Sequence, residues 1–424
     1  MSRSVRVILA IVFVVAAVQG VSLATRGALG YTDVSVFYRT CVLLREGAAG
    51  EIYLHHDTVT DWPISLTPAG LALFQPLASF GPLGAGIGWA IVNLGLFGLS
   101  IFVLRRFLKR AYGPRSDALF SWAALLFIVL AAASIQVGQF SVLFTSSWIL
   151  FLSAFAAGSY AGAGMLLALP TAIKLYPVMM LAVPISLARS TRAVLHTLFG
   201  FMLGLVIFSA IVPFLAYGSR AWDLNASFWE NVIRSPTGQV AYMQTVRASN
   251  QSIDALLLRY LTFDVEFHPE EPAMPHLDLP KQQVLPYANL ARSIILVITI
   301  VAVWRWRSRH PTFAARDVLM MSALWSCTLY LMLPETKARY AVYTFISFLP
   351  LLEVAVNENE PTAARVRSVV EVVLCGILIG GLLPDPPKVY GIGLIGAVVL
   401  WLRNLRLVRE AAGSGLEAPG FAKA

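Results

Sequence analysis

Long apolar segments recur along almost the whole of this 424-residue chain, and they constrain its fold more than any other feature. Many reach about 18 residues or more, the length that a helix needs to cross the hydrocarbon core of a bilayer. The composition agrees, because 58% of the residues are hydrophobic and only 13% are charged. A soluble protein of this size needs more charge to cover its surface. We therefore predict an all-α polytopic membrane protein with about ten to twelve membrane helices.

The first apolar segment, residues 5–24, follows two arginines and resembles a secretory signal peptide. No small-residue cleavage site follows it cleanly, and many more apolar segments come after it. We expect a retained first helix. The three cysteines are odd in number and widely spaced, so they predict neither a disulfide framework nor a metal site.

Basic residues gather at six places, and the positive-inside rule assigns all six to the cytoplasm. These clusters lie at residues 3–6, 105–115, 189–192, 305–316, 365–367 and 403–409. Most acidic residues fall between them. We interpret the net charge of +9 as a topology signal rather than a nucleic-acid-binding patch. The predicted protein lies in the cell membrane with both termini in the cytoplasm and its working face on the opposite side.

Residues 162–188 would form one long span by hydropathy alone. A single span would leave the basic residues at 189 and 192 on the outer side and invert everything that follows. Pro170 and Pro177 flank Lys174 at the centre, and a proline inside a helix removes a backbone hydrogen bond and kinks the helix. We predict a hairpin of two short helices with Lys174 near its tip.

Two substantial outer loops, residues 27–83 and 218–286, separate predicted helices. The first is rich in polar and aromatic residues, and the second carries Trp222, Trp229, several acids and a proline-rich stretch. We detect no soluble domain and no repeat of a soluble type. Residues 1–409 are predicted to form a single transmembrane domain, and the small, polar residues 410–424 a disordered cytoplasmic tail.

Four charged residues stand where a membrane protein could carry chemistry. Asp33 directly follows the first helix, although a solvated loop acid could occupy the same position. An ammonium group at membrane depth is costly, so Lys174 should face the bundle interior or a water-filled cavity, or else snorkel to an interface. Lys337 and Arg339, at the outer end of a span, could bind a lipid phosphate or could equally snorkel.

Two further polar motifs have ordinary structural explanations. The run His55-His56-Asp57 could suggest a metal site, but adjacent histidines on a helix or strand point in different directions and no third ligand has suitable spacing. Asn250-Gln251-Ser252 precedes an amphipathic stretch and could bind hydroxyl groups, or could cap the helix that follows. Neither motif identifies a function by itself.

The order of several short motifs is more specific than any one of them. It runs Thr32-Asp33-Val34-Ser35-Val36-Phe37-Tyr38, Gly50-Glu51-Ile52-Tyr53, Gly138-Gln139-Phe140-Ser141-Val142-Leu143, Ile173-Lys174-Leu175-Tyr176-Pro177 and Asn250-Gln251-Ser252-Ile253. Over about residues 5–350 this succession resembles the polyprenyl-phosphate-mannose-dependent mannosyltransferases of the GT-C superfamily. The nearest group is GT87, which includes α-1,2-mannosyltransferases acting on phosphatidylinositol mannosides.

The resemblance implies a GT-C fold and the transfer of one sugar, expected to be mannose, from a polyprenyl-phosphate donor to a hydroxyl of a glycolipid or glycan acceptor on the outer face. The matching catalytic position is Asp33, expected to act as general base, and one carboxylate with one displacement implies inversion. The chain has no Asp-x-Asp motif for a metal–nucleotide pair, so we expect no metal and no cofactor.

Further residues would contact the substrates in such a reaction. The candidates for the donor phosphate are the cations Lys174, Lys337 and Arg339. The candidates for the rest of the substrates are Tyr38, Tyr53, Gln139, Asn250 and Gln251.

This chain departs from the family pattern at two places. Members often have Tyr-Pro-Pro late in the first loop, where this chain has Leu66-Thr67-Pro68. Members also often carry a histidine on the outer side of a late helix, where this chain has Lys337 and Arg339. The second departure bears on donor binding and on the choice between mannose and another sugar such as arabinose.

Two other classes of protein stay open at this point. A transporter or flippase for a lipid or lipid-linked glycan also needs many helices, a buried cation and broken segments, but such proteins often show inverted repeats, which we do not detect. A non-catalytic assembly subunit would tolerate loss of Asp33. The motifs do not encode the acceptor or the length of the polyprenyl chain.

Overall fold

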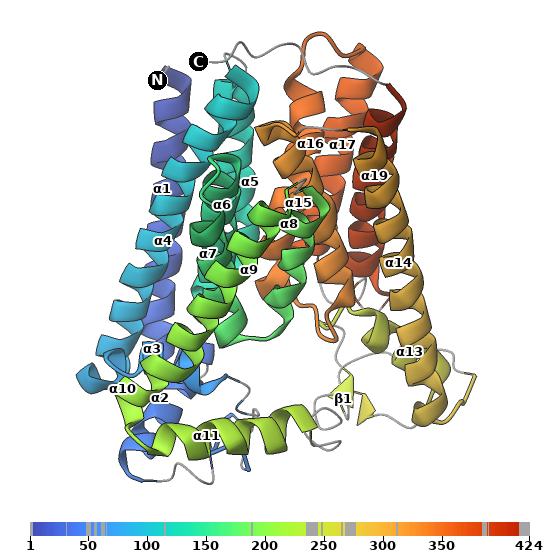
Figure 1. Cartoon of the computed structure of the whole chain (residues 1–424). Helices are drawn as coiled ribbons and strands as arrows, with labels where there is room; N and C mark the ends of the chain where they lie inside the picture. Colours follow the sequence, from blue (N-terminus) through green and yellow to red (C-terminus); the bar gives the residue numbers. More distant parts are fainter. Residues whose placement is uncertain are drawn as a thin grey trace.

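The computed structural model is a bundle of helices with short helices gathered at one end (Figure 1). It describes residues 3–30, 32–47, 52–54, 57–60, 64, 66–113, 116–187, 190–234, 245–246, 249–263, 266–267, 277–310, 313–383, 388 and 390–414. A pair of two-residue parallel strands, β1 (Thr245–Val246) and β2 (Glu266–Phe267), is the only sheet within these residues.

The first half of the chain contains α1 (Arg3–Ala28), α2 (Asp33–Arg45), α3 (Pro68–Phe74), η1 (Leu77–Phe80), α4 (Gly81–Tyr112), α5 (Ser116–Val137), α6 (Ser141–Ala156), α7 (Tyr160–Ile173), η3 (Tyr176–Leu181), α8 (Ala182–Leu187), α9 (Thr191–Val206), η4 (Ile207–Ile211), α10 (Val212–Tyr217), α11 (Arg220–Phe228) and η5 (Trp229–Arg234). The second half contains, besides the two strands, α13 (Ile253–Leu261), α14 (Lys281–Arg309), α15 (Ala315–Met332), η6 (Ala338–Thr344), α16 (Phe345–Val356), α17 (Thr362–Ile379) and α19 (Ile392–Ser414).

Six helices of the described chain are long and apolar enough to cross a membrane, and they span Ser4–Ala28, Leu77–Tyr112, Ser116–Val137, Thr191–Tyr217, Lys281–Arg309 and Ala338–Val356. Shorter apolar helices cover Ser141–Ala156, Tyr160–Ile173 and Tyr176–Leu187. The helices α15, α17 and α19 run within the same bundle (Figure 1). The prediction of an all-α polytopic membrane protein is confirmed.

The two ends of the bundle differ in character. The start of α1 and the end of α19 lie at one end (Figure 1). At the opposite end lie α2, α3, α11 and α13, all drawn from the two predicted outer loops; we call this the loop end (Figure 1). Aromatic stacking holds the bundle between the two ends, since Phe127 lies 4.7 Å from Phe97 and 4.6 Å from Phe345 between ring centroids. These rings join α4, α5 and α16.

The predicted hairpin around Lys174 is present. Helix α7 ends at Ile173, and after Lys174 and Leu175 the chain starts a new helical segment, η3 followed by α8. The Thr67 hydroxyl, from the first loop, lies 2.6 Å from the carbonyl oxygen of Ala172 and 3.1 Å from that of Ile173. This hydroxyl therefore supplies a partner to carbonyls that the end of α7 leaves without a helical bond.

The last helix runs past the predicted start of the C-terminal tail at residue 410. Helix α19 continues to Ser414, five residues into the segment 410–424 that we expected to be disordered. Two contacts explain the extension: Arg406 pairs with Glu410 one turn later, and Arg309 of α14 donates to the carbonyl oxygen of buried Ala412. Residues 415–424 lie outside the described residues.

Candidate active site

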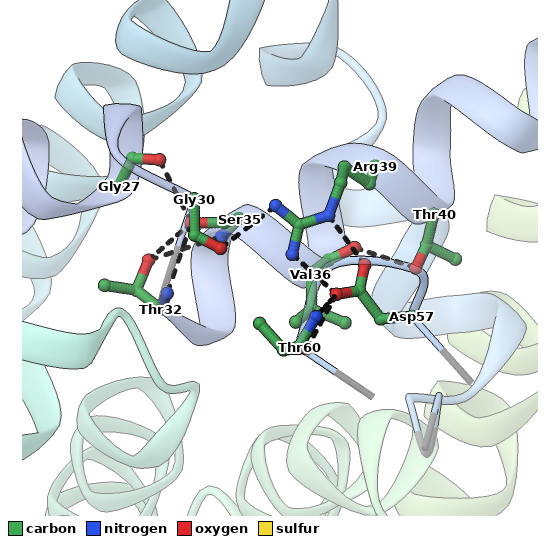
Figure 2. A network of polar contacts seen from close by, with 9 residues as sticks. All are labelled: Gly27, Gly30, Thr32, Ser35, Val36, Arg39, Thr40, Asp57 and Thr60. Atoms are coloured by element: carbon green, nitrogen blue, oxygen red, sulfur yellow. Dashed lines mark hydrogen bonds and ion pairs between the residues drawn. The ribbon is translucent and has the colours of Figure 1, made fainter. Parts of the chain in front are cut away.

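Asp33 is the first residue of α2, and the local sequence fixes its position. Thr32 caps the helix by accepting from the backbone N–H of Ser35, and Ser35 reciprocates toward the backbone N–H of Thr32. The Ser35 hydroxyl also donates to the carbonyl oxygen of Gly27 at the end of α1, 3.0 Å away (Figure 2). The carboxylate therefore starts a helix, where the positive end of the helix dipole favours a negative charge.

A second clamp holds the body of α2. The guanidinium group of Arg39 grips Asp57 in a bidentate pair, with N–O distances of 2.6 and 2.7 Å, and donates to the carbonyl oxygen of Gly30 (Figure 2). Burial would raise the pKa of Asp57, but hydrogen bonds from Arg39 and Thr60 outweigh it and lower that pKa below its ordinary value. Asp57 thus orders the first loop. His55 and His56 lie outside the described residues.

Asp33 meets Arg339, which is 306 residues away in the sequence. Arg339 Nη1 lies 3.0 Å from Asp33 Oδ2, and the two side chains are 19% and 10% exposed. Arg339 is the second residue of η6, which begins the span Ala338–Val356, so the pair joins the start of α2 to the start of a membrane span.

A second carboxylate and a second cation lie next to this pair. Lys337 forms an ion pair with Glu335, whose side chain is 24% exposed. Burial raises the pKa of Glu335, but the positive charges of Lys337, Arg339 and Lys174 outweigh it and lower the pKa below its ordinary value. Glu335 is therefore ionised among three cations.

Lys174 reaches the same place from the tip of the hairpin. Its Nζ lies 5.3 Å from the ring centroid of Tyr340, and the Arg339 guanidinium lies 5.4 Å from the same ring. Both distances are in the cation–π range. The structure thus brings together the three cations that the sequence suggested for phosphate binding.

Aromatic rings form a floor under these charges. Tyr340 stacks on Tyr343 at 5.8 Å, because residues three apart share one face of a 3₁₀ helix. The Tyr343 hydroxyl lies 3.0 Å from Ser141 Oγ and 2.6 Å from the Tyr176 hydroxyl. Phe144 packs against both Tyr176 and Tyr343. The motifs 138–143 and 173–177, separate in sequence, therefore meet under η6.

We call Asp33, Lys174, Glu335, Lys337 and Arg339 the charged cluster. Three positive and two negative side chains leave it with a formal charge of +1. All five lie where helices begin or end at the loop end of the bundle. Such a site suits one anionic group next to a carboxylate.

Gln139 and Tyr53 lie in packed surroundings. Gln139 is buried in the turn between α5 and α6, where Gly138 has a positive φ of +75°. A Cβ at Gly138 would lie 2.9 Å from Leu23 and from Val34, and Trp89 Nε1 donates to the Gly138 carbonyl oxygen at 2.7 Å. Only a glycine therefore fits the turn at residue 138.

Tyr53 donates to the carbonyl oxygen of Leu66 at 2.8 Å. Tyr38 is half-buried against the core, one residue before the clamp residue Arg39.

Asn250 and Gln251 hold the segment that carries the cations. Asn250 Oδ1 accepts from the backbone N–H of Thr336 at 3.0 Å, and the Gln251 backbone N–H donates to the Thr336 carbonyl oxygen at 2.7 Å. The Gln251 side chain bonds the backbone of Lys388 and Gly393.

The residues that sequence reasoning missed are Glu335, as a member of the cluster, and the tyrosines Tyr176, Tyr340 and Tyr343. Glu335 and Tyr340 flank the two cations in the sequence, and the spacing of three between Tyr340 and Tyr343 is a usable signal for a shared face. Tyr176 stands in the motif that supplied Lys174. Nothing in the sequence indicates that Tyr176 and Tyr343 touch.

The fold and the site define a class: a polytopic membrane protein with a charged cluster on an aromatic floor at one end of its bundle. A family model for glycosyltransferase family 87 matches residues 67–334. The chain therefore belongs to glycosyltransferase family 87 and is a membrane glycosyltransferase. No curated protein matches it. The matched region contains Gln139, Lys174, Asn250 and Gln251, while Asp33, Lys337 and Arg339 lie outside it.

Proposed function

We propose that this glycosyltransferase moves one sugar, with mannose the first to test, from a polyprenyl phosphate to a hydroxyl of a glycolipid or glycan acceptor. The observation that carries the proposal is the charged cluster, where two carboxylates and three cations meet within a membrane protein of this family. A polyprenyl-phosphate sugar is a phosphodiester with one negative charge. The formal charge of +1 matches that charge, and electrostatic complementarity favours such a pairing.

The donor phosphate would lie against Arg339, Lys337 and Lys174, with its lipid tail in the bilayer. Arg339 can present two parallel N–H groups to phosphate oxygens, while the lysines act as compact charges. As the bond between the anomeric carbon and the phosphate oxygen breaks, the phosphate gains negative charge. Fixed cations that face this charge stabilise the transition state.

Asp33 is the general base of the proposed reaction. The acceptor oxygen attacks the anomeric carbon, its proton passes to Asp33, and the polyprenyl phosphate leaves from the opposite face. One displacement inverts the anomeric centre, so a β-linked donor gives an α-linked product. We place this chemistry on the extracytoplasmic face of the cell membrane, because the predicted topology puts the loop end there. It needs no metal, and EDTA should leave the rate unchanged.

The direct test is Asp33→Asn, assayed in vesicles with a polyprenyl-phosphate sugar and a lipid acceptor. We expect kcat to fall by about 100-fold or more, the usual contribution of a general base. The matched control is Asp223→Asn, which neutralises an exposed acid of α11 outside the charged cluster. Equal loss in both variants, or wild-type turnover by a folded Asp33→Asn protein, would refute the assignment.

A second variant separates donor binding from chemistry. Arg339→Gln should raise KM for the donor and also lower kcat, because Arg339 binds the phosphate and stabilises the charge that develops on it, whereas Asp33→Asn leaves the phosphate site its cations. A flippase would move the lipid-linked sugar across vesicles without forming a glycosylated product. An assembly subunit would do neither and would tolerate Asp33→Asn.

A further inference from the structure

A cavity separate from the charged cluster lies at the loop end. It has a volume of about 210 Å³ and lies between the end of α2, the segment after α3, the end of α10 and the start of α11. Its polar lining is Arg45, Gln75, Tyr217 and Arg220, and its apolar lining includes Leu44 and Leu224. None of the charged cluster contributes to it.

Two membrane spans mark the level of this cavity relative to the bilayer. The span Thr191–Tyr217 ends at it, and the span Leu77–Tyr112 begins two residues after Gln75. Apolar side chains face outward on the bilayer side of both boundaries: Leu215 is 79% exposed and Phe80 is 70% exposed. The cavity therefore lies where the hydrocarbon region meets the phospholipid headgroups.

The charges at the cavity are positive. Arg45 is held in place by donating to the Gln75 carbonyl oxygen at 2.9 Å and to Ser79 Oγ at 2.6 Å. Arg220, the first residue of α11, is exposed on the other side. None of the lining residues is acidic, although Glu46 and Asp223 stand nearby in the sequence. Two arginines without a lining acid suit a phosphate group.

Helix α11 has the side chains expected of a segment at the membrane surface. It lies across the ends of the bundle helices (Figure 1), with Leu224 and Phe228 buried against the protein. Trp222 is 60% exposed two residues after Arg220. Tryptophan is enriched where headgroups meet hydrocarbon, because its ring is apolar and its N–H is polar.

We propose that this cavity binds the headgroup phosphate of an anionic phospholipid, with Arg45 and Arg220 on the phosphate. The acyl chains run along the outward-facing side chains Phe214 and Leu215. This lipid links α11 to α2, whose opposite end carries Asp33 about 18 Å away at 1.5 Å per residue. The site is distinct from the donor site and does not depend on the sugar-transfer proposal.

The test measures lipid binding by the full-length purified protein. Phosphatidylglycerol and phosphatidylcholine are added to delipidated protein, and bound lipid is counted by native mass spectrometry. We expect the wild type to hold about one phosphatidylglycerol tightly. Arg220→Gln should bind it at least roughly tenfold more weakly, because the variant loses one charge-assisted hydrogen bond. Arg26→Gln, at an exposed arginine near the same end of the bundle, is the matched control and should bind as the wild type does.

Several outcomes would overturn the proposal. Equal binding by the wild type and Arg220→Gln, or equal affinity for phosphatidylcholine, would do so. Displacement of the lipid by millimolar inorganic phosphate would indicate a site for small anions instead. Arg45→Gln is a second variant, but it also breaks contacts to Gln75 and Ser79, so Arg220→Gln decides. Asp33→Asn should keep the lipid, which separates failure of this site from failure of the catalytic assignment.

Discussion

The contact between α7 and α9 gives a prediction whose size can be worked out from the structure. The two helices cross at glycines: a Cβ added to Gly164 would lie 2.0 Å from the carbonyl oxygen of Thr197, and one added to Gly200 would lie 2.0 Å from that of Ala161. Contacts below 3.0 Å do not occur for real Cβ atoms, so an alanine at either position must push the helices apart by about 1 Å or more.

This displacement matters because α7 ends beside Lys174. Overpacking of this kind costs about 1–3 kcal/mol of stability. A shift of about 1 Å at a group that positions substrate can lower activity on the order of 100-fold. Gly164→Ala should therefore lower both the melting temperature and kcat/KM for the donor. The double variant with Gly200→Ala should lose less than the sum of the two single losses, because the first methyl group already opens the crossing.

The matched control is Gly95→Ala in α4, where an added Cβ meets nothing within 4 Å. It adds the same methyl group to a membrane helix and should leave activity unchanged. Melting temperatures in detergent and donor kinetics in vesicles measure both effects. Wild-type stability and kinetics for Gly164→Ala would refute the reasoning, as would equal losses in Gly95→Ala.

Three further outcomes follow from contacts around the site. Folding lowers the pKa of Asp57 from its ordinary 3.8, so its pairing stabilises the protein above about pH 4 and is lost as the pH falls through the lowered pKa. The melting temperature of Asp57→Asn should therefore lie below that of the wild type at neutral pH, and the difference should shrink in acid. A difference that stays constant with pH would contradict this. Thr67→Val leaves the Ala172 carbonyl without this partner and should lower the free energy of unfolding in detergent by about 1–3 kcal/mol. Thr67→Ser should restore it. Asn250→Ala removes the acceptor for the Thr336 N–H and should raise donor KM more than it lowers kcat. Asn250→Asp keeps an acceptor oxygen and should retain the wild-type donor KM. An equal rise in donor KM in the two variants would point to direct substrate contact by the amide.

The sequence predicted the membrane helices and the hairpin well, because both depend on local chemistry. Apolar length identifies the six longest spans of the described chain. The basic residues at 189 and 192 required a reversal near Lys174, where the structure has one. The elements of the loop end were harder. Helices α2, α3 and α11 are short and stay in place through distant contacts, such as Thr67 with Ala172, that no local pattern encodes.

The site was predicted as a set of residues and not as an arrangement. Motif order suggested Asp33 and Lys174, and their position at the outer end of a span suggested Lys337 and Arg339. The structure places all four in one cluster. The pairing of Asp33 with Arg339 joins residues 306 apart, so it depends on how the helices pack. The pKa of Glu335 is lowered by Lys337 and Arg339, its near neighbours in the sequence, and also by Lys174, which only the fold brings close. Reasoning from single residues in the sequence cannot give the combined effect of these charges on the pKa of Glu335.

The Asp33–Arg339 pair also implies a result opposite to the usual effect of losing a site residue. A donor phosphate that binds Arg339 must compete with the carboxylate already 3.0 Å from its Nη1. Asp33→Asn removes the competing negative charge, so it should bind the donor several-fold more tightly even as turnover falls. Titration with a non-transferable phosphonate analogue of the donor measures this, with Asp223→Asn as the unchanged control. Weaker binding by Asp33→Asn would mean that Asp33 holds Arg339 in its binding position, and the competition would then play no part in donor entry.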